Sequence, residues 1–213
     1  MYRVLILLLL ASFALPSFAD AQMNRGRRNR RQQRQQAPAD QPGLADLDTI
    51  VPKLSSDNSD EVREAIDLLS VIDRPEVIPH LATLLRSGQP DAITDRALEA
   101  LGGLAHSGGI EILTAFTHHR RSGARRRAYQ GLAAISDRRI PDLLERGLSD
   151  SDRNVRATSA LALGEIGAQD SARIPPHTSE ELEQARGACQ ADPELLRAIE
   201  RALARLEAGR PRP

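Results

Sequence analysis

NVRATSALALGEIG, residues 154–167, is the stretch that decides the fold of this chain. Around Leu163, a small residue lies four positions earlier, at Ser159, and an aliphatic residue lies three positions later, at Ile166. Residues at these spacings share one face of a helix. Because a small side chain lets a neighbouring helix approach closely, the stretch predicts a helix that packs through Leu163.

The same pattern occurs four times along the chain. Its central leucines are 32, 31 and 31 positions apart. A fixed period of this length indicates stacked helical repeats. The predicted repeat core is Leu69, Leu101, Leu132 and Leu163, with small residues at Ala65, Ala97, Ala128 and Ser159 and closing aliphatics at Ile72, Leu104, Ile135 and Ile166.

Turn residues follow each pattern, and a second helix with the form I-P-x-L or a close variant then begins. Each unit is therefore a helical hairpin that cannot bury its apolar face alone. We predict an all-α fold, an α-solenoid of about four hairpins with capping helices. The expected turns lie at 73–75, 107–109, 136–137 and 167–170, the second helices open at 78–81, 110–113 and 140–143 with Leu81, Leu113 and Leu143 inward, and a capping half-repeat opens at 51–54.

The C-terminal part departs from the repeat. Residues 170–191 predict a loop interrupted by proline and a polar helix from Ser179 to Gln190. A final helix follows, with Asp192 as N-cap and Pro193 in its first turn. Its apolar stripe is Leu195, Leu196, Ile199, Leu203 and Leu206, and Gly209 is expected just after its end.

Residues 154–167 resemble the V-R-x-x-A-A-x-A-L-G-x-I-G pattern of the short bacterial HEAT-like repeats first named from phycobilisome lyases. Residues 60–65 resemble the start of another copy, whereas Ala124 to Arg127 depart from it. The resemblance covers roughly residues 44–175. It implies a repeat scaffold whose second helices line a concave face where partners dock.

A signal peptide is predicted over residues 1–21. Arg3 provides a basic start, and the apolar run 4–15 is shorter than the ~20 residues of a membrane span. Small residues then allow cleavage after Ala19 or after Ala21. We therefore expect an exported protein, periplasmic or secreted, without a transmembrane segment after cleavage.

Residues 22–43 predict a disordered Arg-, Gln- and Pro-rich linker, because its few apolar side chains cannot offset the entropy of ordering. Its six arginines contrast with residues 40–209, which carry 20 basic and 28 acidic side chains. The linker is either a solvated spacer or a polyanion-binding arm, since Arg suits phosphate. The spacer is favoured because exported proteins meet little nucleic acid. The repeat domain spans 44–209, and 210–213 form a disordered tail.

Composition excludes several classes of function. The 213 residues include no Trp and five aromatics, of which only Phe116 and Tyr129 follow the signal peptide. This excludes an aromatic platform for single-stranded nucleic acid. Cys189 is the only Cys, so no intrachain disulfide forms, and a buried, inert thiol is expected.

No catalytic, cofactor or metal site is predicted. The five His residues include no pair four positions apart, and none is followed by Glu. HEAT-like deoxyhypusine hydroxylases, which resemble this fold, use His-Glu pairs for iron, and those pairs are missing from this sequence. No G-x-S-x-G motif occurs, and the Gly pairs at 102–103 and 108–109 lack the Lys of a phosphate-binding loop.

Two surfaces are candidate binding sites. The first is the outward side of the second helices, which is polar and lacks aromatic anchors, so it favours a modest, charge-steered contact. The second is a basic patch beside residues 122–123, where arginines open a helix despite the unfavourable helix dipole. The candidate face comprises His80, Thr83, Ala115, His118, His119, Asp142 and Glu145, and the candidate basic patch comprises Arg120, Arg121, Arg125, Arg126 and Arg127.

These features favour an exported, non-catalytic HEAT-repeat scaffold with a protein partner in the cell envelope. One alternative is a polyanion-binding protein that takes lipopolysaccharide, anionic lipid or nucleic acid through the Arg-rich linker and the 118–127 cluster. A second alternative is a bilin-lyase-like enzyme or enzyme partner, although a repeat match alone does not carry function.

Overall fold

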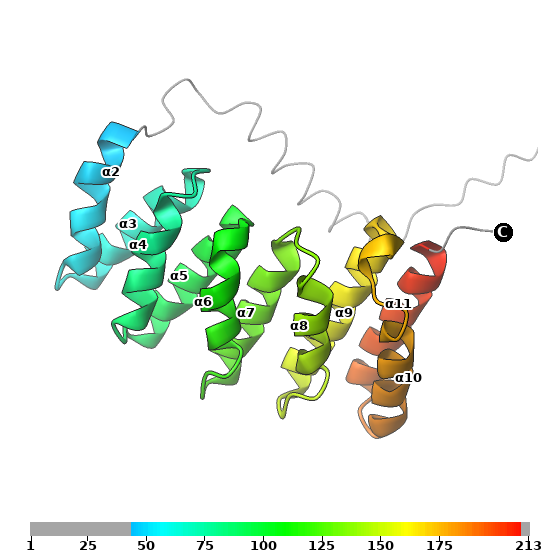
Figure 1. The fold of residues 1–213 in the computed structure, drawn as a ribbon. Helices are drawn as coiled ribbons and strands as arrows, with labels where there is room; N and C mark the ends of the chain where they lie inside the picture. Colours follow the sequence, from blue (N-terminus) through cyan, green and yellow to red (C-terminus); the bar gives the residue numbers. More distant parts are fainter. Residues whose placement is uncertain (1–43, 210–213) are drawn as a thin grey trace, which may run out of the picture. The chain divides into compact units, whose positions relative to one another are not determined.

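The computed structural model describes residues 44–209, and this part of the chain consists of helices joined by short turns (Figure 1). The expected signal peptide, Arg-rich linker and C-terminal tail lie outside the described residues. The α-helices are α2 (Leu44–Ile50), α3 (Ser59–Val71), α4 (Val77–Arg86), α5 (Asp91–Leu104), α6 (Ile110–Phe116), α7 (Ser122–Ala134), α8 (Ile140–Gly147), α9 (Arg153–Gln169), α10 (Thr178–Ala188) and α11 (Pro193–Gly209), with short 3-10 helices η1 (Val51–Ser55), η2 (Ser107–Gly109) and η3 (Ser171–Arg173).

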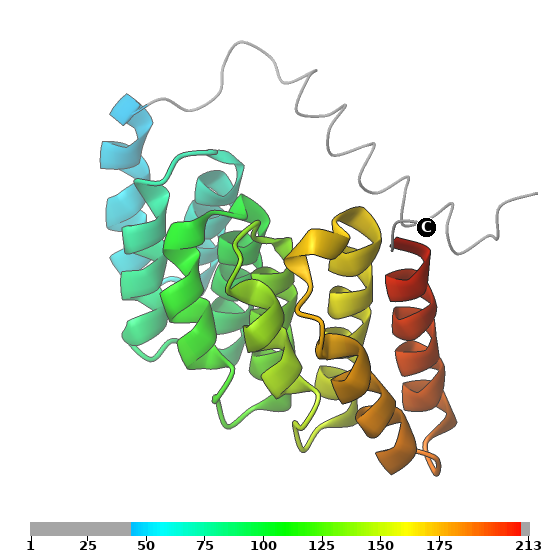
Figure 2. The same cartoon turned by 45° about the vertical axis from the view of Figure 1, so that its right-hand side comes forward.

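The helices form two layers, as Figures 1 and 2 show from two sides. One layer, called here the inner layer, consists of α3, α5, α7, α9 and α11. The other, the outer layer, consists of α4, α6, α8 and α10. Each hairpin contributes one helix to each layer, so the predicted all-α solenoid is confirmed.

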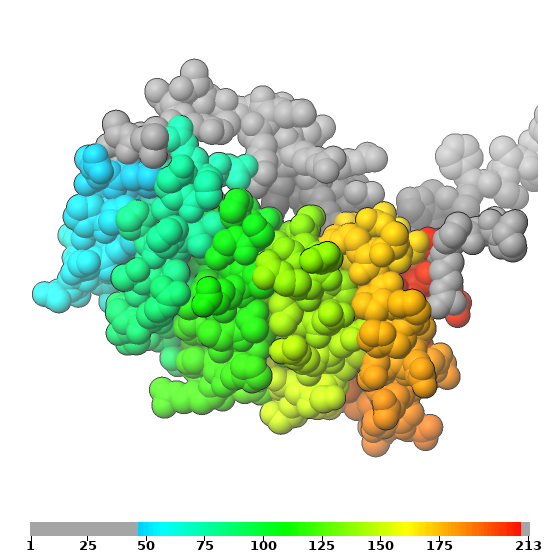
Figure 3. Space-filling view, in the orientation of Figure 1, coloured from blue at the N-terminus to red at the C-terminus, as the bar shows by residue number. Residues whose placement is uncertain are grey.

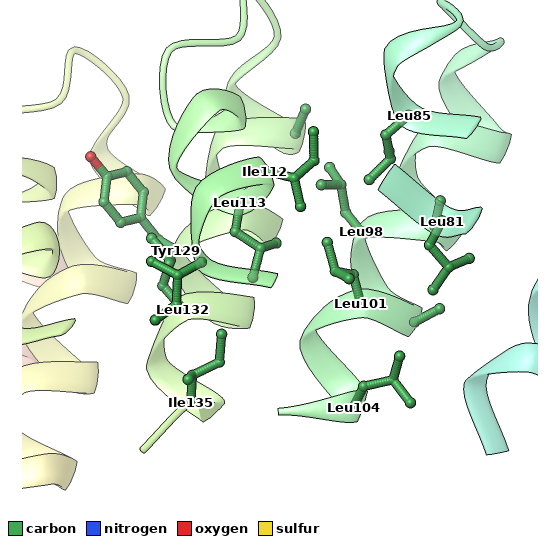
Figure 4. Packing of buried hydrophobic residues seen from close by; sticks show 14 of the residues in the cluster. Leu81, Leu85, Leu98, Leu101, Leu104, Ile112, Leu113, Tyr129, Leu132 and Ile135 are labelled. Carbon is green, nitrogen blue, oxygen red and sulfur yellow. The ribbon is translucent and has the colours of Figure 1, made fainter. Parts of the chain in front are cut away.

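The repeat leucines lie in the core between neighbouring hairpins. Leu69, Leu101, Leu132 and Leu163 are at most 1% exposed. Figure 4 shows Leu101 on α5 and Leu132 on α7 among buried side chains from the adjoining helices. Each hairpin thus completes the apolar core of its neighbour, as a repeat that cannot bury its own face requires.

Polar side chains cap the starts of three inner-layer helices. Asn58 accepts the backbone N–H of Asp60 at the start of α3, and Asp152 accepts two backbone N–H groups at the start of α9. Asp192 accepts the backbone N–H groups of Glu194 and Leu195, which confirms it as the N-cap of α11. These caps satisfy donors that would otherwise lack a partner in the first turn.

Glycine and alanine bring the inner-layer helices into close contact. A Cβ placed on Gly102 of α5 would lie 2.6 Å from the Cα of Gly131 on α7, and one placed on Gly164 of α9 would lie 2.6 Å from the Cα of Ala202 on α11. Neighbouring inner helices pack along their lengths, whereas neighbouring outer helices scarcely touch. In a curved two-layer stack the more closely spaced layer lies on the inside of the curve. The expectation that the second helices line the concave face is therefore wrong, because the first helix of each hairpin does.

Four local predictions also need correction. Leu144 is the fully buried counterpart of Leu81 and Leu113, whereas Leu143 is only partly buried. The I-P-x-L motif placed the buried residue of α8 one position too early, because Leu81, Leu113 and Leu144 keep the spacings of 32 and 31 found between the core leucines. The stretch 51–54 forms the 3-10 helix η1 after α2 and does not open an α-helix.

The expected turn at 167–170 is the last turn of α9 instead. A Cβ on Gly167 would lie 2.0 Å from the Cδ2 of Leu206, so this glycine provides space for α11 within a helix. Gly209 is the last residue of α11 and does not follow it. In α11, Leu195, Ile199 and Leu206 are buried, and the other two stripe residues are partly buried.

Candidate partner-binding surfaces

The candidate face lies on the outer layer and is spread over α4, the end of α6 and α8. His80 is partly buried on α4, and exposed Thr83 donates its hydroxyl to the carbonyl of Pro79 at 2.8 Å. Ala115 and His118 are exposed at the end of the next hairpin's outer helix. These residues therefore lie on different helices of the more widely spaced outer layer.

His119 stabilises a turn. Its ring stacks on Phe116, with ring centres 5.4 Å apart and an angle of 13° between the planes. Its Nδ1 accepts the backbone N–H of Arg121 at 3.2 Å, and its carbonyl accepts from Arg125 at 3.0 Å. These contacts fix the connection between α6 and α7, so the predicted role of His119 as a partner contact is not supported.

Glu145 is also occupied within the fold. Its Oε1 accepts the hydroxyl of Thr178 at 2.5 Å, and its Oε2 lies 3.1 Å from Nε2 of His177. The Glu145 side chain is 14% exposed. It therefore attaches the start of α10 to α8, and its prediction as a solvent-facing binding residue is wrong.

Asp142, the remaining member of the face, lines a cavity of about 530 Å³ between α6 and α8. These two helices lie side by side on the face that Figure 3 shows. Thr114 also lines the cavity, and its buried Oγ1 has no hydrogen-bond partner in the described structure. The other lining residues are Ile110, Glu111, Arg139, Leu143 and Arg146.

Acidic neighbours neutralise most of the candidate basic patch. Arg121 contacts Asp95 at 2.7 Å and Asp91 at 2.9 Å. Arg127 contacts Asp95 at 3.2 Å and Glu99 at 3.0 Å. Hydrogen bonding to Asp95 raises the pKa of Arg121 above its ordinary value, so the guanidinium stays charged and paired.

The pair of Arg125 and Asp150 is the most enclosed of these contacts, with side chains 14% and 9% exposed. Two parallel hydrogen bonds of 2.7 and 2.8 Å join them. Burial alone would raise the pKa of Asp150, but hydrogen bonds from Arg125 and from the backbone of Asp152 hold that pKa below its ordinary value. The prediction of an open basic patch is therefore wrong for Arg121, Arg125 and Arg127.

Arg120 and Arg126 differ from the other three. Arg120 is exposed, and neither side chain forms an ion pair within residues 44–209. The Nε of Arg126 is buried and has no hydrogen-bond partner there. Arg126 is therefore a cation at the start of α7, on the inner layer, that has no ion-pair partner within residues 44–209.

Ion pairs between neighbouring inner helices recur at equivalent positions of the repeat. Arg96 of α5 contacts Asp67 of α3 at 2.5 Å, and Arg127 of α7 contacts Glu99 of α5 at 3.0 Å. In both cases the carboxylate lies two residues before one repeat leucine, and the Arg lies five residues before the next. This pairing was not predicted from the sequence, although comparison of those two positions across the repeats would have indicated it.

Residues 44–209 contain no group of three or more His, Cys, Asp or Glu side chains placed to hold a metal ion. No helix in that range combines the length and the apolar character that crossing a membrane requires.

Comparisons with known proteins agree with the geometry. Residues 110–204 match the sequence family described as HEAT repeats, and no curated protein matches the chain. An engineered protein of known structure aligns with a TM-score of 0.50 and 21% identity over 78% of this chain and 81% of its own. Importin beta aligns with a TM-score of 0.53 and 19% identity over 78% of this chain but only 26% of its own.

A designed armadillo repeat protein solved with a (KR)4 peptide aligns with a TM-score of 0.51 and 16% identity, covering 76% of this chain and 82% of its own. A phycocyanin lyase complex from Nostoc aligns with a TM-score of only 0.39, which supports no argument about activity. At these identities the structural comparisons establish the fold alone. The helical hairpins, their period and the match over residues 110–204 are together consistent with a HEAT-like repeat protein.

Proposed function

We propose that this protein is an exported, non-catalytic scaffold that binds a protein partner through the inner layer of its solenoid. The observation that carries the proposal is the close packing of α3, α5, α7, α9 and α11. This packing forms a continuous surface on which side chains recur at the repeat spacing. Repeat solenoids use extended concave surfaces of this kind for binding.

The side chains of the inner layer suit a protein partner. Val71 of α3 is 61% exposed, and Leu161 of α9 is partly exposed and lies outside the apolar core. Between them lie the ion-paired side chains of α5 and α7. Apolar positions within a polar surface are typical of protein interfaces. The peptide bound to the designed armadillo repeat protein provides a precedent for this use of a similar fold.

Export is proposed from the residue pattern of positions 1–21, which has a basic start, a short apolar run and small residues at two cleavage sites. The partner is then a protein of the cell envelope or the medium.

Site-specific photo-crosslinking in the host tests the proposal. A benzophenone side chain at position 161, on the inner layer, should give a defined adduct with a partner protein. The same group at position 83, on the outer layer, is the matched control and should give little or none. Equal adducts from both positions, or none from 161, would contradict the proposal.

The polyanion-binding alternative makes a different prediction. Deletion of residues 22–36 should leave the adduct at position 161 intact if the solenoid binds the partner. Loss of the adduct on deletion would favour the linker as the binding element. The pairing of Arg121, Arg125 and Arg127 with carboxylates weakens this alternative for the folded domain.

A further inference from the structure

The contact between α5 and α7 shows how one junction of the inner layer satisfies its charges. Asp95 and Glu99 of α5 lie six and two residues before Leu101, and both contact Arg127 of α7, at 3.2 and 3.0 Å. Arg127 lies five residues before Leu132. At this junction the three repeat positions hold Asp95, Glu99 and Arg127, so the guanidinium of Arg127 lies between two carboxylates.

The junction of α7 and α9 has different residues at the same three positions. Arg126 replaces the first carboxylate, Gln130 replaces the second, and Thr158 replaces the cation. No carboxylate therefore meets Arg126, which forms no ion pair within residues 44–209, and its buried Nε has no acceptor there. Gln130 is exposed beside it, one turn along α7.

An unpaired cation with a buried N–H is costly, and an added carboxylate could accept hydrogen bonds from the terminal nitrogens of the guanidinium, which are not among its buried atoms. Gln130 has an amide that can pair with a peptide main chain. On α9, partly exposed Leu161 provides a small apolar contact at the repeat position of Gln130 and Glu99.

We propose that the junction of α7 and α9 binds an acidic side chain on an extended segment of the partner protein. The partner's carboxylate pairs with Arg126, as Asp95 and Glu99 pair with Arg127 in the preceding junction. This proposal rests on the proposed function, because it specifies the chemistry of the segment that docks on the inner layer. Charge complementarity selects this occupant over a basic or apolar segment.

Two blocked heptapeptides test the proposal, Ser-Leu-Ala-Glu-Ala-Leu-Ser and its twin with Gln in the centre. In a heteronuclear NMR titration of the folded protein, the Glu peptide should shift the Nε–H signal of Arg126 and the side-chain amide of Gln130. It should bind roughly tenfold more tightly than the Gln twin, the factor expected for one charge-assisted hydrogen bond.

Two variants and two matched controls locate the site. Arg126→Gln removes the cation, and Gln130→Glu supplies an internal carboxylate one turn away, so each should abolish the preference for the Glu peptide. The controls Arg120→Gln and Gln184→Glu make the same chemical changes at exposed positions outside the junction and should preserve it. Circular dichroism melts of all four variants test whether each still folds.

Several results would overturn the proposal. These are equal affinity for the two peptides, loss of the preference in Arg120→Gln to the same extent as in Arg126→Gln, or an equal response of Arg126 to inorganic phosphate. A chain that still gives the crosslinked adduct at position 161 after Arg126→Gln would refute this proposal and leave the proposed function standing. Absence of any adduct in the wild-type chain would refute the proposed function itself.

Discussion

Replacement of Gly102 with Ala tests the close contact between α5 and α7 on which the inner layer depends. The new Cβ would lie 2.6 Å from the Cα of Gly131, whereas ordinary contact begins at 3.4 Å. The new Cβ is attached directly to the backbone of α5, and the Cα belongs to the backbone of α7. Neither atom can move without its helix, so α5 and α7 must separate by about 1 Å in a tightly packed interior. Gly103, the next residue of α5, has nothing within 4 Å of the corresponding position and is the matched control.

The two substitutions should have opposite signs. Gly103→Ala should stabilise the fold by about 0.5–1 kcal/mol, because Ala loses less conformational entropy than Gly in a helix. Gly102→Ala gains the same amount, but overpacking costs about 1–3 kcal/mol. The net effect should be a loss of up to about 2.5 kcal/mol.

Urea unfolding followed by far-UV circular dichroism measures both changes. For a domain of this size, each kcal/mol moves the thermal midpoint by about 2–4 °C, so melting curves provide a second measurement. If Gly102→Ala proved as stabilising as Gly103→Ala, α5 and α7 would not be in backbone contact, and the assignment of the concave side would lose its basis.

Three further predictions concern the core, the acid stability and the N-terminus. Leu132→Ala should cost about 2–5 kcal/mol, and Leu206→Ala should cost less because the terminal helix can fray, so the reverse order in urea melts would contradict the assignment of repeats and cap. The lowered pKa of Asp150 implies that its pairing with Arg125 stabilises the fold above about pH 4 and is lost as the pH falls through the folded-state pKa. Arg125→Gln should therefore lower stability at neutral pH and flatten its decline in acid, and parallel pH curves for variant and wild type would contradict this. Intact mass of host-produced protein should show a chain that begins at residue 20 or 22, and retention of residues 1–19 would argue against export.

The architecture could be predicted from the sequence because the repeat period is local information. A small residue, a Leu and an aliphatic at fixed spacing define the face of a helix, and their recurrence around Leu69, Leu101, Leu132 and Leu163 requires stacked hairpins. The cap at Asp192 was equally accessible, since its hydrogen bonds join residues two and three positions apart.

The candidate sites were harder to predict because their chemistry depends on partners far away in the chain. Glu145 has the pattern of an exposed helix residue, yet it binds Thr178, which is 33 positions later. Three of the five patch arginines find carboxylates about 25 or more positions away. Only the folded chain brings such pairs together, so a cluster of like charges in the sequence need not be a charged surface.

The sequence by itself determined the fold class, the repeat period and the core leucines, because these follow from the spacing of side chains along one helix. Only the tertiary structure decided which layer is concave, which charges remain unpaired and where an open pocket lies between α6 and α8. These properties depend on distances between helices. Those distances are set by residues such as Gly102 and Gly131, whose effect appears only when two helices meet.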